Sequence, residues 1–219
     1  MKVLIHACPQ RMWYVEEFLY PSLRDQGLQA EDIDIWNDTE GKGNLQSCME
    51  SFAARPAGDG GTWHIQDDVL ICRDFVKRCR ENDEGVVYGF CCKKFTDDPQ
   101  KYGTVRICDA WHSFQCIRIP DAYARECADW FFTDARHRFI FRDWVASGKR
   151  DDNFFSAYLE DRHFDDPILN LAPNLVDHVD ILIGGSILSE WRNYIARAHY
   201  FEDADLVADL RNRIKARGL

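Results

Sequence analysis

The sequence predicts an α/β fold, with a mostly parallel central sheet flanked by helices. Short apolar segments typical of strands alternate along the chain with longer segments whose apolar residues recur at helical spacing. The 219 residues are enough for one sizeable core with a small appended lobe. Hydrophobic residues make up 46% and charged residues 29%, which is ordinary for a globular protein. We therefore expect helices on both faces of one sheet.

The order of the segments supports this fold class. The expected strands are residues 2–8, 32–38, 62–71 and 85–95, with a further strand early in 113–132. The expected helices are residues 12–28, the middle of 41–61, residues 72–82, the segment that follows Pro120, and the apolar-periodic run after Asp152. Pro21 should interrupt the first helix, because proline lacks a backbone N–H and crowds the preceding turn.

Charge limits the classes of partner. A formal net charge of −10 argues against a broad nucleic-acid-binding face, which requires a basic surface. The last ten residues reverse this balance with Arg211, Arg213, Lys215 and Arg217 and no acid. We expect these cations to complement the dipole at the end of a helix.

The chain is expected to remain in the cytoplasm of the producing or host cell. No apolar run approaches the length of a membrane-spanning helix, and the apolar run near the N-terminus is too short for a signal peptide. The nine cysteines are odd in number and contain no C-x-x-C pair. We expect all nine to be reduced thiols and none to bind zinc.

Two adjacent acids interrupt the third strand. Asp67 and Asp68 follow an apolar run and precede another at residues 69–71. Ligands of open α/β sheets bind outside the carboxyl ends of the strands, where these acids should lie. Paired carboxylates there suit Mg²⁺ or Mn²⁺, which take carboxylate and phosphate oxygens. The alternative is that they only open a turn or cap the next helix, and the spacing alone does not choose between the two.

The late segment "PNLVDHVDILIGGS", combined with the acid run "QDD", resembles glycosyltransferases of the GT-A fold. The likeness is to members with a Glu-Asp-Asp version of the Asp-x-Asp motif, with Gln66 in place of the first acid. The resemblance implies that Asp68 binds a divalent metal, Mn²⁺ or Mg²⁺, and that His178 is a further ligand. It also implies a ribose contact from Gln66, with Asp67 as a close neighbour. A lone histidine with a purely structural role is the alternative for His178.

The same resemblance covers residues 2–190 in element order and implies a nucleotide-sugar donor, most simply a UDP-sugar. The donor-side residues that it implies, beyond Gln66 and Asp67, are Ala7, Cys8, Pro9, Arg11, Asn37, Asp38, Lys42, Asn44, Gly184, Gly185 and Ser186. For Lys42, a solvated surface position is an equal alternative.

The acceptor side is implied by residues later in the chain. Asp151 and Asp152 precede an apolar-periodic run, so they either complement a helix dipole or act on the acceptor. An inverting enzyme needs a base of this kind to take the proton of the acceptor hydroxyl. Asp109, Trp111 and His112 form another polar and aromatic cluster, although core packing is an alternative use for the tryptophan.

We therefore expect residues 1–219 to form a single GT-A-like domain, a minimal transferase of viral or bacterial type. Residues 1–100 would be the nucleotide-sugar half, 101–190 the acceptor half and 191–219 a C-terminal helical segment. The acceptor is a small glycan or, using the basic C-terminal segment, modified DNA. A metal-dependent nucleotidyltransferase and a non-catalytic α/β interaction protein remain as alternatives. The first would need a glycine-rich phosphate loop after the first strand, and "HACPQRMW" has no glycine.

Overall fold

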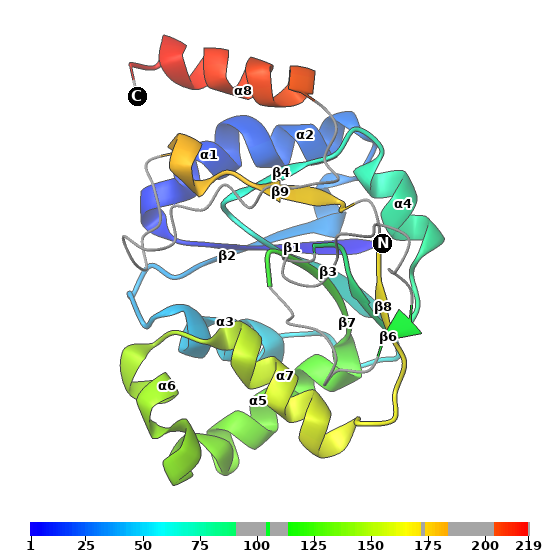
Figure 1. The fold of residues 1–219 in the computed structure, drawn as a ribbon, viewed down its shortest axis with the longest axis vertical. Coiled ribbons are helices and arrows are strands. Elements are labelled where there is room, and N and C mark those ends of the chain that lie inside the picture. Colours follow the sequence, from blue (N-terminus) through cyan, green and yellow to red (C-terminus); the bar gives the residue numbers. More distant parts are fainter. Residues whose placement is uncertain (91–103, 106–113, 172–173, 184–203, 219) are drawn as a thin grey trace.

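The computed structural model describes residues 1–90, 104–105, 114–171, 174–183 and 204–218. Its main sheet has seven strands, in the spatial order β2-β1-β3-β7-β5-β8-β6 (Figure 1). In chain order they are β1 (Lys2–Ala7), β2 (Ile33–Asn37), β3 (Gly61–Gln66), β5 (Val86–Tyr88), β6 (Thr104–Val105), β7 (Cys116–Pro120) and β8 (Ile168–Asn170).

Most strands of this sheet run in one direction. β1 pairs in parallel with β2 and β3, and β5 pairs in parallel with β8. β7 lies antiparallel between β3 and β5, and β6 is antiparallel to β8. Five of the seven described strands are therefore parallel, so the expectation of a mostly parallel sheet is confirmed. The carboxyl ends of β1, β2 and β3 meet at one edge, and the antiparallel strand β7 begins at that edge.

A second, two-stranded sheet begins where the acids stand. The expected third strand is in fact two: β3 ends at Gln66, and β4 (Val69–Ile71) belongs to the second sheet. Its partner is β9 (Val176–His178), with Val69 opposite His178. Asp67 and Asp68 are the two residues at which the chain passes from one sheet to the other. This crossing brings a late segment of the chain to the acids.

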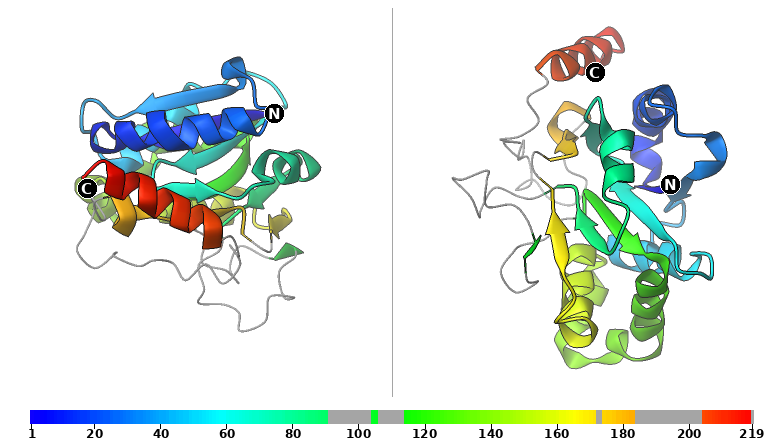
Figure 2. Two further views of the ribbon diagram at one scale, coloured as in Figure 1. Left: turned by 90° about the horizontal axis from the view of Figure 1, so that it is seen from above. Right: turned by 90° about the vertical axis from the view of Figure 1, so that its right-hand side faces the viewer.

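Helices cover both faces of the main sheet (Figures 1 and 2). One face carries α3 (Asn44–Ala53), α5 (Asp121–Thr133), α6 (Arg142–Ser147) and α7 (Asp151–Arg162). The other carries α1 (Met12–Tyr14), α2 (Tyr20–Asp25), α4 (Phe75–Glu81) and α8 (Ala204–Ala216). Alternate residues of β1 and β3 face the two layers: Val3, Ile5, Trp63 and Ile65 belong to the core under α2, α4 and α8. The opposite side chains of these strands face α3 and α7.

The first helical stretch shows how Pro21 is accommodated. α1 and α2 are joined by a π-helical turn at Val15–Leu19, so the helical path runs on through the proline. In a π-turn each carbonyl accepts from the N–H five residues later, one residue further than in an α-helix. This change of partner accommodates the N–H that proline lacks. The break that the sequence predicts is therefore a local change of helix type.

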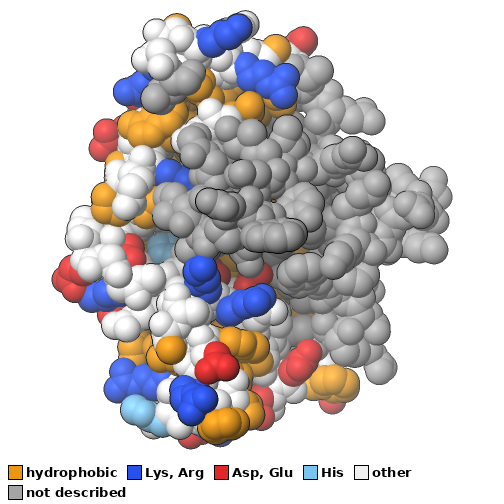
Figure 3. All heavy atoms as spheres, turned by 60° about the vertical axis from the view of Figure 1, so that its left-hand side comes forward, with side chains coloured by type: hydrophobic (Ala, Val, Ile, Leu, Met, Phe, Trp, Pro, Cys, Tyr) orange, Lys and Arg blue, Asp and Glu red, His pale blue; other side chains and the backbone are white. Residues whose placement is uncertain are grey.

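Three of the basic C-terminal residues, Arg211, Arg213 and Lys215, belong to α8, and Arg217 follows its last residue. Figure 3 shows Lys and Arg side chains at the end of the molecule that α8 occupies and others over the opposite end. The guanidinium carbon of Arg213 lies 4.2 Å from the ring centroid of Phe18, and that of Arg217 lies 4.7 Å from Trp13. These cation–π contacts fix α8 to the first helical stretch.

Six cysteines lie in the described part of the chain, and all six are free thiols. Among the described residues, no helix is both long and apolar enough to cross a bilayer. Strands from both sides of residue 100 share the main sheet, whereas the single-domain assignment and its divisions at 100 and 190 remain predictions.

Candidate functional site

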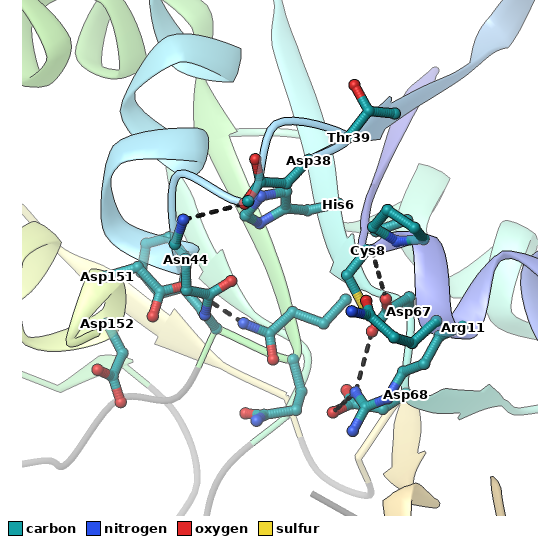
Figure 4. A pocket seen from close by; sticks show the side chains of 18 of the residues that line it. His6, Cys8, Arg11, Asp38, Thr39, Asn44, Asp67, Asp68, Asp151 and Asp152 are labelled. Atoms are coloured by element: carbon teal, nitrogen blue, oxygen red, sulfur yellow. Dashed lines mark hydrogen bonds and ion pairs between the residues drawn. The ribbon is translucent and has the colours of Figure 1, made fainter. Parts of the chain in front are cut away.

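A cavity of about 400 Å³ lies at the edge where β1, β2 and β3 end (Figure 4). Its walls come from the end of β1, the loop after β2, the β3–β4 crossing, the residues before β7, the start of α7 and the end of β9. The lining residues that the sequence singled out are Ala7, Cys8, Pro9, Arg11, Asp38, Asn44, Gln66, Asp67, Asp68, Asp151, Asp152 and His178.

Arg11, which the sequence placed beside a nucleotide base, forms ion pairs with both buried acids. Asp67 and Asp68 are only 5% and 7% exposed. Nη1 of Arg11 donates to Oδ1 of Asp67 at 3.0 Å and to Oδ2 of Asp68 at 2.5 Å. The backbone N–H of Cys8 donates to the other oxygen of Asp67 at 2.8 Å. Both oxygens of Asp67 are thus used within the protein, so this residue holds the end of β1 against the crossing.

Asp68 faces His178, 110 residues later in the chain. Nε2 of His178 lies 2.9 Å from Oδ2 of Asp68. The backbone holds the pair together from both sides: Val69 lies opposite His178 in the sheet, and the N–H of Val179 donates to the carbonyl of Asp68 at 2.8 Å. The expected proximity of Asp68 and His178 is confirmed, while their role as metal ligands remains a prediction.

The two carboxylates differ in protonation behaviour. Burial raises the pKa of Asp67, and the neighbouring charge of Asp68 raises it further against the opposing effect of Arg11. Burial also acts to raise the pKa of Asp68, but the charges and hydrogen bonds of His178 and Arg11 outweigh it and hold that pKa below its usual range. Asp68 is therefore the more acidic of the two carboxylates.

The residues around Asp68 fit a divalent cation. Oδ1 of Asp68 is buried and has no hydrogen-bond partner among the described residues. One guanidinium against two carboxylates leaves room for further positive charge beside this oxygen. A carboxylate oxygen suits Mn²⁺ or Mg²⁺, which take most of their other ligands from phosphate and water. An added imidazole nitrogen favours the transition metal Mn²⁺ over Mg²⁺, whose preferred ligands are all oxygens.

A second pair of acids forms the opposite wall (Figure 4). Asp151 and Asp152 begin α7, where negative charge complements the helix dipole, which is one of the two alternatives that the sequence left open. Both also line the cavity. Nε2 of Gln66 donates to Oδ2 of Asp151 at 3.3 Å. In this structure the Gln66 amide therefore orients an acid, and its expected ribose contact remains a prediction.

The loop after β2 connects the two walls. The carboxylate of Asp38 accepts the backbone N–H groups of Lys42 and Gly43 at 2.9 and 3.0 Å. Gly43 has φ of +87°, and a Cβ there would lie 2.9 Å from the carbonyl oxygen of Gly148. Gly148 in turn accepts the N–H of Leu45 at 3.0 Å. This close contact places the segment before α7, and hence Asp151 and Asp152, against the loop.

Gly43→Ala should therefore destabilise the protein by more than about 1 kcal/mol, because both the positive φ and the backbone contact exclude a side chain. Gly41→Ala is the matched control: it has φ of +66° but nothing within 4 Å of the added atom. Denaturant unfolding of both variants measures the difference. Equal losses in the two variants would show that the Gly43–Gly148 contact has no role.

Some predicted site residues lie elsewhere. Lys42 is not among the residues that line the cavity, and its ammonium lies 2.9 Å from a carboxylate oxygen of each of Glu40 and Glu50. Asn37 ends β2 and is also absent from the lining. The remaining predictions lie outside the described residues: Gly184, Gly185, Ser186, Asp109, Trp111 and His112.

Other lining residues were not found from the sequence, including His6, Thr39, Phe114 and Gln115. The backbone carbonyl of Gln115 accepts the N–H of Gln66 at 3.1 Å, and its buried side-chain oxygen has no partner among the described residues. These residues precede β7, which runs antiparallel to β3, so the start of β7 lies where β3 ends. A strand parallel to β3 would begin at the opposite edge of the sheet. The expectation of parallel strands therefore did not place Phe114 and Gln115 at the cavity.

Comparison with known structures identifies the fold. A scan of protein-family models and a search of curated proteins found no match to the sequence. TarS of S. aureus (residues 1–349) superposes over 84% of this chain and 62% of its own length, with 13% identity and a TM-score of 0.50, and a second TarS structure gives 0.51. The chain has a GT-A-like fold. It spans about three fifths of the truncated TarS.

Two further structures superpose on this chain with TM-scores below 0.50. The galactosyltransferase LgtC covers 97% of this chain and 96% of its own length, with 10% identity and a TM-score of 0.49. The inositol-1-phosphate CTP transferase of T. maritima covers 97% and 76%, with 13% identity and a TM-score of 0.41. At 13% identity the likeness to TarS shows the fold alone.

Proposed function

We propose that the protein is a metal-dependent glycosyltransferase that moves a sugar from a nucleotide-sugar donor, most simply a UDP-sugar, to a hydroxyl acceptor. The observation that supports this best is the cavity at the strand ends. It has the Asp68–His178 pair on one wall and the Asp151–Asp152 pair on the other. One wall suits a cation and a diphosphate, and the other suits proton transfer.

Asp68 and His178 would hold the cation, Mn²⁺ or Mg²⁺. When bound, the ion neutralises the negative charge that develops on the leaving diphosphate. Two protein ligands leave most of the coordination shell to phosphate oxygens and water, which is usual for these ions. Arg11 and the N–H of Cys8 hold Asp67 in place, and this in turn fixes the position of the neighbouring Asp68 carboxylate.

The opposite wall provides the base. Asp152 is less buried than Asp151 and lines the cavity, so we propose that Asp152 is the base that accepts the proton of the acceptor hydroxyl. Asp151 is 4% exposed and accepts from Gln66, and its role is to orient the acceptor or its neighbour. Ala7, Pro9, Asp38 and Asn44 would surround the nucleotide, as the resemblance to GT-A enzymes implies.

The acceptor we propose is a small glycan. The modified-DNA alternative relied on the basic C-terminal segment, but Arg213 and Arg217 of that segment already pack on aromatic rings. A cytoplasmic location remains a prediction.

The test is turnover of nucleotide sugars without acceptor, with and without Mn²⁺. UDP-GlcNAc is a suitable first probe, since TarS has been crystallised with it. We expect slow release of UDP and free sugar that EDTA abolishes, because water can replace the acceptor hydroxyl. A nucleotidyltransferase would instead release pyrophosphate from a nucleoside triphosphate in the presence of a sugar phosphate. Absence of metal-dependent binding and turnover across a panel of nucleotide sugars would overturn the proposal.

A further inference from the structure

A row of polar side chains, buried at Thr62 and His64 and partly buried at Gln66, runs along β3 beneath α3, α5 and α7. Thr62, His64 and Gln66 alternate with apolar residues and so share one face of the strand. Oγ1 of Thr62 donates to Asp121 at 2.8 Å, and Gln66 donates to Asp151. His64 lies between them, is 0% exposed, and neither ring nitrogen has a hydrogen-bond partner among the described residues. Thr62 and Gln66 thus have hydrogen-bond partners, whereas the ring of His64 between them has none among the described residues.

Two ligand-type side chains meet His64. His6 lies on the same face of the adjacent strand, diagonal to His64, because His6 is opposite Gln66 in the register. Cys48 comes from α3, which packs on that face. Ligand atoms of His6, Cys48 and His64 all lie within 4.8 Å of one another, and this is the one such group of three among the described residues. No sequence spacing reveals it, since the three residues come from three separate elements.

The chemistry of the cluster suits a metal. Burial lowers the pKa of His6 to about 4 and lowers the pKa of His64 well below its usual value. Both imidazoles are therefore neutral at physiological pH, which is the form that ligates metal. Burial raises the pKa of the Cys48 thiol, so a thiolate forms there only if a cation replaces the proton.

The size of the cluster also fits. Zinc binds histidine nitrogen at about 2.0–2.1 Å and cysteine sulfur at about 2.3 Å in a tetrahedral arrangement, which separates the ligand atoms by roughly 3.3–3.6 Å. Atoms within 4.8 Å of one another reach that spacing by small side-chain movements. Nε2 of His6 lies 2.9 Å from Oγ of Ser47, a contact that fixes the orientation of the ring.

We propose that His6, Cys48 and His64 form a zinc site that joins β1, α3 and β3, separate from the Asp68–His178 pair. Binding displaces one proton from the Cys48 thiol for each Zn²⁺ bound, and the thiolate and two imidazoles leave a fourth position open. His6 lines the cavity, so the ion enters from that side. The site would join β1, which leads to the wall with Asp68 and His178, to α3, which packs against the helix that carries Asp151 and Asp152. This inference replaces the expectation that no cysteine binds zinc, and it does not depend on the proposed function.

The first measurement uses the unaltered chain. Protein is loaded with Zn²⁺ under reducing conditions and dialysed against metal-free buffer, and the retained zinc is measured by mass spectrometry. We expect about one zinc per chain. X-ray absorption of the loaded protein should show two nitrogens near about 2.0 Å and one sulfur near about 2.3 Å. A chain that retains no zinc, or an ion with only oxygen neighbours or with more than one sulfur, would overturn the proposal.

Matched variants locate the ion. Cys48→Ser and His64→Gln should lose the retained zinc. Cys127→Ser should keep it, because Cys127 is equally buried in the same core but contacts Met49. Asp68→Asn should also keep it, which separates this site from the cavity site. If Cys48→Ser retains zinc, or if Asp68→Asn loses it, the assignment is wrong. Should Cys48→Ser fail to fold, the absorption spectrum of the unaltered chain decides.

Discussion

Asp68→Asn is expected to lower sugar transfer by more than about 100-fold and to abolish Mn²⁺-dependent binding of UDP. The loss of a metal ligand should exceed the 10–100-fold that typically follows loss of a second-shell partner. Asparagine keeps the shape of the side chain and one oxygen for Arg11, so the fold should survive. Calorimetric titration of UDP with and without Mn²⁺ measures the effect on binding.

Asp67→Asn is the matched control for this experiment. Asp67 is as buried as Asp68 and bonds the same guanidinium, but its oxygens are used by Arg11 and the N–H of Cys8. We expect this variant to lose stability and to retain most of its Mn²⁺-dependent affinity for UDP. His178→Gln should behave like Asp68→Asn. Unchanged UDP affinity in Asp68→Asn, or equal losses in the two aspartate variants, would contradict the division of roles.

Arg11→Met is expected to lower the free energy of unfolding by roughly 3–5 kcal/mol, because it leaves two buried carboxylates without their cation. Urea unfolding measures this loss. Because removal of the guanidinium would raise the pKa of both acids in the folded state, the loss of stability should be largest near neutral pH. It should shrink as the pH falls toward the usual carboxyl pKa of about 4. Added Mn²⁺ should recover part of the loss, since a divalent cation supplies the missing charge.

Charge compensation is the control for Arg11→Met. A triple variant that also carries Asp67→Asn and Asp68→Asn removes the unpaired charges and should regain a large part of the stability at neutral pH. Its stability should no longer respond to pH in this range or to Mn²⁺. If the triple variant is as unstable as Arg11→Met alone, packing of the arginine stem rather than its charge is what supports the site.

The candidate site was only partly accessible from the sequence. Asp67 and Asp68 could be placed at a ligand-binding edge because an apolar strand ends there, and strand ends are where α/β sheets bind ligands. The acids of α7 could be placed at a helix start by the same local reasoning. Arg11 could not be predicted as the partner of Asp67 and Asp68, because it lies 56 and 57 residues from them in the chain. Its pairing depends on how the turn after β1 folds back over the crossing.

The register of the second sheet shows the same limit. The resemblance to GT-A enzymes suggested that His178 lies near Asp68, but only the antiparallel pairing of β4 with β9 provides the physical cause. The direction of β7 was missed for a related reason. Its apolar pattern is the same whether it runs parallel or antiparallel, so Phe114 and Gln115 could not be assigned to the cavity.

What the sequence by itself determined was local: the alternation of strands and helices, the end of the apolar run at Gln66, the acidic start of α7 and the basic end of α8. Each follows from periodicity, capping and charge within a few residues. The tertiary structure decided the rest: Arg11 between two acids, His178 opposite Val69, and His64 beside His6 and Cys48. These contacts join residues that are up to 110 positions apart, and a contact at that separation depends on strand order and register. No pattern within a single segment encodes that order, because each strand's residues fit a neighbour on either side.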